Sequence, residues 1–196
     1  MRFLFVIAVV LAGLGICAAN AVIQNAGEPR TLSEKAEQCV FVQQLTDPQR
    51  SSRLIAGREG EYVSKNYDEA LKWCHDAAEQ GDIGAQAVMG DQYTAGQGVP
   101  QDYARGIKWF YRAANQGDAK SQLAVGLLYA KGHGVKQDDA AALFWLVLAA
   151  NRGDQDAAGP RDDVQSRLRP DQIADIYKQV DVWKPHPDIS QLRGKP

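Results

Sequence analysis

Residues 81–118 read GDIGAQAVMGDQYTAGQGVPQDYARGIKWFYRAANQGD, and this stretch sets the pattern for the rest of the chain. It opens and closes on the dipeptide Gly-Asp, which returns at 153–154, so successive copies lie 36 residues apart. Other landmarks keep the same step, among them Trp73, Trp109 and Trp145. A period of this length predicts an array of stacked helical repeats.

Each 36-residue unit contains two helix patterns separated by a glycine-rich turn. In the last unit, aspartates provide the N-caps of helices predicted over 119–130 and about 139–151. Gly132-His133-Gly134 lies between them and ends the first helix, because glycine reaches positive φ without a Cβ penalty. We expect the same arrangement one and two steps earlier, where Asp102 and Asn66 hold the cap position of the second helix.

The second helices place small residues and tryptophan on one face. In the last unit this face is Ala142, Trp145 and Ala149, which follow helical spacing. We interpret the face as the core of the repeats rather than as a ligand site. Trp109 has a repeat on both sides, so we expect it to be the most buried tryptophan.

The motifs of the repeat unit resemble the Sel1-like repeats, which are relatives of the tetratricopeptide repeat with slightly longer units. The runs that support the resemblance are Ala85-Gln86, Met89-Gly90, Tyr93, Gly96-Gln97-Gly98-Val99, Asp102, Trp109-Phe110, Ala113-Ala114 and Gly117-Asp118. The resemblance implies an all-α fold: a right-handed α-solenoid of helix-turn-helix repeats with capping helices at both ends. It also implies a concave face that binds other proteins, and it implies no catalytic residue and no cofactor.

The repeat frame divides the chain into five parts. The expected parts are a signal peptide (1–21), an N-terminal helix with a degenerate half-repeat (22–65), the repeats (66–154), capping helices (155–184) and a loose tail (185–196). The repeats comprise a partial unit, 66–82, and two full units, 83–118 and 119–154. In the capping region we expect Gly159-Pro160 to interrupt a helix that begins at Gln155.

The N-terminus has the pattern of a secretory signal. Arg2 precedes an apolar run, 3–16, that is short for a membrane span, and Ala19-Asn20-Ala21 fits a cleavage site before Val22. Lipid attachment at Cys17 is disfavoured because such sites need a small residue where Ile16 stands. We therefore predict export across the inner membrane to the periplasm, with no membrane span left after cleavage.

Cleavage would leave two cysteines, Cys39 and Cys74. In an oxidising compartment two thiols often pair, and this bond would pin a predicted helix over 32–46 onto the first repeat. The alternative is two separate buried thiols.

Composition and motifs argue against several classes of function. The formal net charge is −2 and no basic run occurs, which argues against nucleic acid or an anionic membrane as partner. The three histidines show no metal-ligand spacing, and no phosphate loop or nucleophile motif is present. We expect no enzyme activity.

The remaining hypothesis is a binding module that holds another protein or peptide. Its surface should lie on the first helices of the repeats, at positions that the repeat pattern does not use: Asp91, Gln92, Ala124, Leu127 and Leu128. Neighbouring helices could instead cover both leucines. Two alternatives stay open, a cell-envelope enzyme acting on peptidoglycan and an obligate structural subunit of an envelope assembly.

Overall fold

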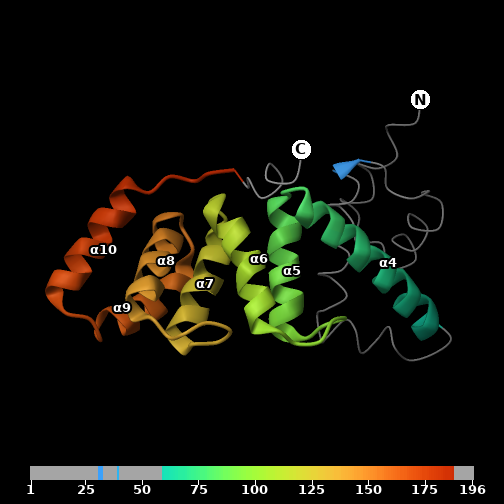
Figure 1. Cartoon of the computed structure of the whole chain (residues 1–196), viewed down its shortest axis with the longest axis horizontal. Coiled ribbons are helices and arrows are strands. Elements are labelled where there is room, and N and C mark those ends of the chain that lie inside the picture. The colour runs from blue at the N-terminus through green and yellow to red at the C-terminus, as the bar shows by residue number, and fades with distance from the viewer. Residues whose placement is uncertain (1–30, 33–38, 40–58, 188–196) are drawn as a thin grey trace.

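The computed structural model describes residues 31, 32, 39 and 59–187 of the chain. The regular secondary structure among these residues is helical, and none of them forms a strand (Figure 1). The elements in order are α4 (Glu59–Glu79), α5 (Ile83–Ala95), α6 (Tyr103–Asn115), α7 (Ala119–Lys131), α8 (Asp139–Asn151), η2 (Gln155–Ala157), α9 (Ala158–Gln165) and α10 (Pro170–Val182). The predicted signal peptide and nearly all of the predicted helix over 32–46 lie outside the described residues. Of the described helices, none has the length and apolar character needed to cross a membrane.

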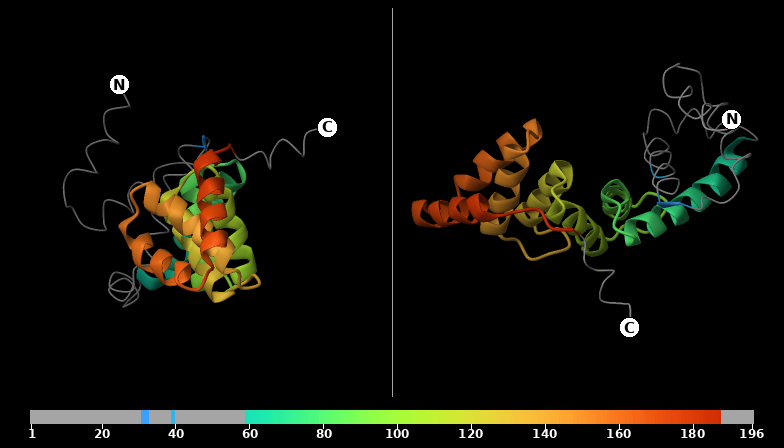
Figure 2. Two further views of the ribbon diagram at one scale, coloured as in Figure 1. Left: turned by 90° about the vertical axis from the view of Figure 1, so that its left-hand side faces the viewer. Right: turned by 90° about the horizontal axis from the view of Figure 1, so that it is seen from above.

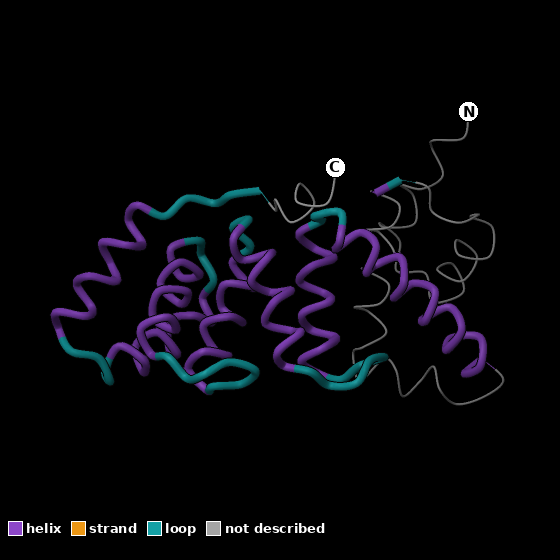
Figure 3. Tube along the Cα trace, viewed as in Figure 1, coloured by secondary structure: helices purple, strands orange, loops and turns teal. Residues whose placement is uncertain are grey.

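The helices stack side by side in one row. α5 packs against α6 and α7 against α8, while α6 joins the two pairs by packing against α7. At one end α4 packs on α5, and at the other α9 and α10 pack on α8. Seen from above, the row follows a curve (Figure 2), and the chain trace shows how short loops connect the repeat helices (Figure 3). The predicted all-α solenoid is confirmed.

Aspartates begin the repeat helices, as the sequence predicts. The Asp102 and Asp118 carboxylates accept hydrogen bonds from the backbone amides of Arg105 at 2.9 Å and Ser121 at 2.8 Å. Asp138 accepts two such bonds from the first turn of α8. Each bond satisfies an amide that the helix geometry leaves without a partner.

Glycines end the first helix of each full repeat. Gly96 and Gly132 follow α5 and α7 with φ angles of 71° and 70°. Side chains other than glycine rarely adopt this left-handed conformation, so the turn depends on glycine. The loop after α7 then lies against the start of α6, because a Cβ on Gly134 would come within 2.4 Å of the Tyr103 backbone.

The first repeat differs from the prediction. We expected a helix to begin at Asn66, but α4 runs unbroken from Glu59 to Glu79, so Asn66 lies inside it. The next repeat turns at two glycines, Gly96 and Gly98, and Gly98 has a φ angle of 70°. The first repeat keeps Gly60 but has Tyr62 where Gly98 would stand. Tyrosine adopts that conformation only at a cost, and the helix continues instead.

The C-terminal capping region also differs. The short 3-10 turn η2 leads straight into α9, so Gly159 and Pro160 do not interrupt the helix. Pro160 lies in the first turn of α9, where its missing amide removes no helical hydrogen bond. Val164 of α9 and Ile176 and Val180 of α10 are buried in the cluster that contains the core of α8, and they cover the end of the row.

Small residues on the first helices allow the second helices to approach closely. A Cβ on Gly90 would come within 2.6 Å of the Phe110 ring, and a Cβ on Gly126 would come within 2.7 Å of Leu146. Any side chain at either glycine would therefore push the two helices of its repeat apart.

Tryptophan burial corrects one expectation. Trp145 is 4% exposed and Trp109 is 8% exposed, so Trp109 is not the most buried tryptophan. The rings of Tyr111, Phe144 and Trp183 all pack on Trp145 at centroid distances of 5.0 to 6.3 Å. Two rings from the repeat helices and Trp183, which follows α10, together shield Trp145.

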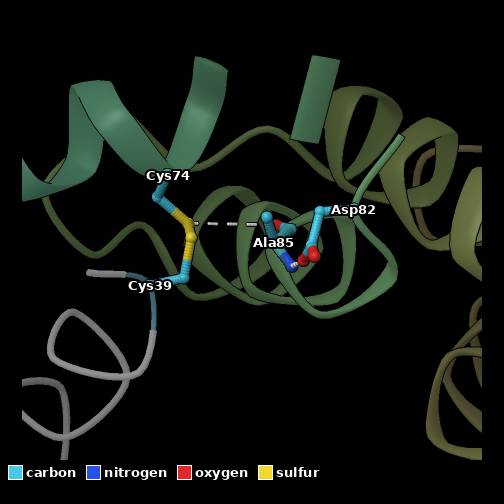
Figure 4. The surroundings of a disulfide bond; sticks show 4 residues. All are labelled: Cys39, Cys74, Asp82 and Ala85. Carbon is cyan, nitrogen blue, oxygen red and sulfur yellow. Dashed lines mark hydrogen bonds between the residues drawn. A yellow bond between two sulfur atoms is a disulfide. The ribbon is translucent and has the colours of Figure 1, made fainter. Parts of the chain in front are cut away.

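A disulfide joins Cys39 to Cys74 of α4 (Figure 4). Both cysteines are buried, and their Cα atoms lie 4.9 Å apart. The Cys74 sulfur lies 4.0 Å from the Ala85 carbonyl oxygen, next to the point where Asp82 caps α5. The bond therefore attaches a residue N-terminal to the repeats to the junction between α4 and α5.

Candidate interaction surface

The five residues predicted to bind a partner separate into an accessible set and a buried set. Asp91 and Leu127 occupy the same position in successive repeats; Asp91 is exposed and Leu127 is half-buried, as is Ala124. Gln92 and Leu128 occupy the next position and are only 1% and 8% exposed. We call Asp91, Ala124 and Leu127 the first-helix face.

The prediction that Gln92 and Leu128 lie on a binding surface is wrong. Consecutive residues of a helix point about 100° apart, so a side chain next to an accessible one can face the interior. Leu128 belongs to the same buried cluster as Val125 and Leu143, between the two helices of the last repeat. Both positions therefore contribute to the fold and cannot contact a partner directly.

The Asp91 carboxylate has an unusual electrostatic environment. Partial burial of the carboxylate, together with the nearby negative charge of Asp118, raises its pKa from 3.8 to about 6. Lys120 acts in the opposite direction but does not cancel these two effects. At neutral pH the first-helix face thus holds a carboxylate that water and neighbouring charges stabilise poorly.

Hydrogen bonds between repeats connect α5, the helix that carries Asp91, to its neighbours. The Gln116 side chain at the end of α6 donates to the Gly81 carbonyl oxygen at 3.1 Å and to the Gln86 side-chain oxygen at 2.8 Å. Gln86 is fully buried and donates in turn to the Ala78 carbonyl oxygen at 3.1 Å. The end of α4, the start of α5 and the end of α6 are therefore linked by buried and partly buried amide groups.

Arg112 of α6 also connects two repeats, because its side chain reaches the end of α4. Its guanidinium lies 4.5 Å from the centre of the Trp109 ring, forms an ion pair with Glu79 at 3.1 Å and donates to the Ala78 carbonyl oxygen. Cation–π and charge-assisted contacts of this kind fix the orientation of α6 relative to α4.

The histidines take part in ring packing. His75 packs edge-on against Trp109 at 5.5 Å, and His133 packs against Tyr103 at 4.9 Å. Across the described part of the chain, no three His, Cys, Asp or Glu side chains gather in a way that could hold a metal ion.

Sequence reasoning missed a second group of residues, at the ends of α6 and α8. Tyr111 is 40% exposed although its ring packs on Trp145, and burial of the hydroxyl raises its pKa. Arg152 stands where the two preceding repeats have Gln80 and Gln116, and this break in the repeat was the signal available in the sequence. The Arg152 guanidinium lies 5.3 Å from the centre of the Trp183 ring.

Comparison with known proteins places these features in a family. Residues 55–82, 83–118 and 119–154 match the Sel1 repeat, so the first match begins earlier than the expected partial unit. No curated protein matches the chain. Among solved structures, a Sel1 repeat protein from Oxalobacter formigenes is 34% identical with a TM-score of 0.50, covering 67% of this chain and 95% of its own.

A second solved structure shares the fold over a longer stretch. It is a protective antigen of uropathogenic Escherichia coli that displays an SLR fold, with a TM-score of 0.69 and 19% identity. The match covers 93% of this chain but 37% of the antigen, so the chain spans little more than a third of that protein.

Proposed function

We propose that the chain, which belongs to the Sel1 repeat family, binds a partner protein or peptide through the first-helix face. Members of this family are generally protein–protein interaction modules and typically non-catalytic scaffolds. In this proposal it acts as an adaptor, scaffold or regulator in a bacterial-type cell envelope. The observation on which the proposal rests is the contrast between two adjacent positions. Gln92 and Leu128 are buried, whereas Asp91 is exposed and Leu127 is half-buried.

The chemistry of this face indicates what it would bind. Asp91 is poorly stabilised by its surroundings, so a cationic group of a partner would relieve its charge. Leu127 and Ala124, at half-buried positions of the first helix of the next repeat, offer an apolar contact. We expect the partner segment to present both a lysine or arginine and an apolar side chain.

A display library of random peptides, selected on the immobilised full chain, tests the site. We expect enrichment of peptides that carry both groups and loss of their binding in Leu127→Asp. Binding should be retained in Lys108→Asp, which places an aspartate at an exposed position of α6. Circular dichroism must show that both variants fold. Enriched peptides that bind Leu127→Asp as tightly as the unchanged protein would place recognition elsewhere.

The proposed location in the envelope has support from two features. Residues 1–21 have the composition of a secretory signal, and the Cys39–Cys74 disulfide fits an oxidising compartment. N-terminal sequencing of protein recovered from the envelope fraction should then read from Val22. A chain with Met1 intact, or one starting at a lipid-modified Cys17, would contradict the proposed processing.

A further inference from the structure

The segment after α10 turns back along the row of helices. Residues 183–187, here called the strap, are not helical, and Trp183 begins the strap with extended backbone angles of −70° and 137°. Figures 1 and 3 show the strap running from the end of α10 back over the repeats. The His186 amide donates to the Asn115 carbonyl oxygen at the end of α6 at 2.9 Å. Residues 185–187 belong to the segment predicted to be a loose tail, and this bond is the backbone contact that joins them to the repeats.

Trp183 anchors the strap in a defined place. Its ring packs edge-on against Trp145 at 6.3 Å, and the Arg152 guanidinium lies over it at 5.3 Å. Arg152 is itself held against the end of α6, since a Cβ on Gly117 would lie 3.0 Å from the guanidinium carbon. Trp183 thus occupies a place made by α8 and the Arg152 side chain. We call Tyr111, Asn115, Trp145 and Arg152 the strap site.

The rest of the strap is weakly held. Lys184, Pro185, His186 and Pro187 are all exposed. Among the described residues, the amide of His186 makes the strap's only backbone hydrogen bond to the repeats. Tyr111 lies one helical turn before Asn115 on α6 and remains 40% exposed, so the strap leaves part of the surface around it uncovered.

One aromatic ring packed against other side chains and one backbone hydrogen bond are contacts by which a short extended peptide can bind a preformed surface. Trp is also the side chain that a guanidinium binds best through its face. The strap therefore shows what kind of ligand the strap site accepts.

We propose that the strap site is a second binding site, which the chain's own strap blocks until an extended partner segment displaces it. The displacing segment carries a tryptophan for the place between Trp145 and Arg152, and a free backbone amide three residues later for the Asn115 carbonyl. Because the site is open only in the fraction of molecules whose strap has detached, the strap lowers the apparent affinity for such a segment by that fraction. This site is separate from the first-helix face, so it does not depend on the function proposed for that face.

The test uses the full chain and a fluorescent peptide with the sequence of residues 179–188. Trp183→Ala removes the anchor and should bind the peptide at least about tenfold more tightly than the unchanged protein. Val182→Ala changes the neighbouring side chain, which is 77% exposed, and should behave like the unchanged protein. A peptide with alanine in place of the tryptophan should not bind, and adding Arg152→Ala to Trp183→Ala should abolish binding.

Other outcomes would overturn the proposal. Equal binding by Trp183→Ala and the unchanged protein would mean that the strap only packs against the cap. If Trp183→Ala fails to fold, His186→Pro is tested in its place, because it removes the backbone amide that bonds Asn115 and keeps the tryptophan. If His186→Pro binds the peptide no more tightly than the unchanged protein does, the proposal is rejected. Concentration-dependent dimers that the peptide dissociates would show that the occupant is the strap of a second copy rather than a partner.

Discussion

At the scale of single residues, Asp91 is exposed, yet its surroundings disfavour the ionised form of its carboxyl group. Its pKa is about 6 in the folded chain and 3.8 as the ordinary value, so the folded state binds more protons between these two pH values. The contribution of Asp91 to stability therefore falls as pH rises through this window, and the full penalty is present above pH 6. A shift of this size corresponds to about 3 kcal/mol, but solvent screens an exposed group, so we expect roughly 1 kcal/mol or less.

Asp91→Asn should accordingly be more stable than the unchanged protein at pH 7.5, by up to about 1 kcal/mol, and the gap should narrow towards pH 4.5. Urea denaturation of both proteins across this range measures the gap. Asp181→Asn, at an exposed aspartate of α10, serves as the control for the loss of one carboxylate. A gap that widens as the pH falls would show that the assigned direction of the pKa shift is incorrect.

At the level of the helix and its turns, the sequence was informative wherever a local rule decided the outcome. Aspartate caps and the left-handed glycines at 96 and 132 fixed the ends of the helices in the full repeats. Burial was harder to predict: Gln92 and Leu128 depend on which way each helix turns against its partner, which no local pattern specifies. Likewise, the return of the strap to Asn115 depends on contacts between segments about 70 residues apart.

The link between Cys39 and α4 makes a prediction at the same level. The two cysteines are 35 residues apart, and closing a loop of that size is worth about 2–4 kcal/mol in the chain-entropy model. Cys39→Ser should lower the free energy of unfolding by this amount, as measured with urea. Reductant should destabilise the unchanged protein and have little effect on the variant. Equal stability of the oxidised and reduced forms would show that the bond contributes nothing.

At the scale of the whole molecule, the described residues form two buried clusters that meet at α6. Trp109 belongs to the cluster that contains Cys74 and Met89, whereas its neighbour Phe110 belongs to the cluster that extends through α8 into the cap. In a repeat array, stability is approximately a sum of units and nearest-neighbour contacts. A substitution in one cluster should therefore destabilise the helices of that cluster more than the helices of the other cluster.

Trp109→Ala and Trp145→Ala test this division. Each substitution should cost about 3–5 kcal/mol, with Trp145→Ala the more damaging because that ring is more deeply buried. Hydrogen exchange followed by mass spectrometry should show faster exchange of α4 and α5 amides in Trp109→Ala, and of α8 and α10 amides in Trp145→Ala. Faster exchange spread evenly over all helices in both variants would mean that the row unfolds as one cooperative unit. Greater damage from Trp109→Ala would instead show that the cap stabilises the array less than its packing on Trp145 indicates.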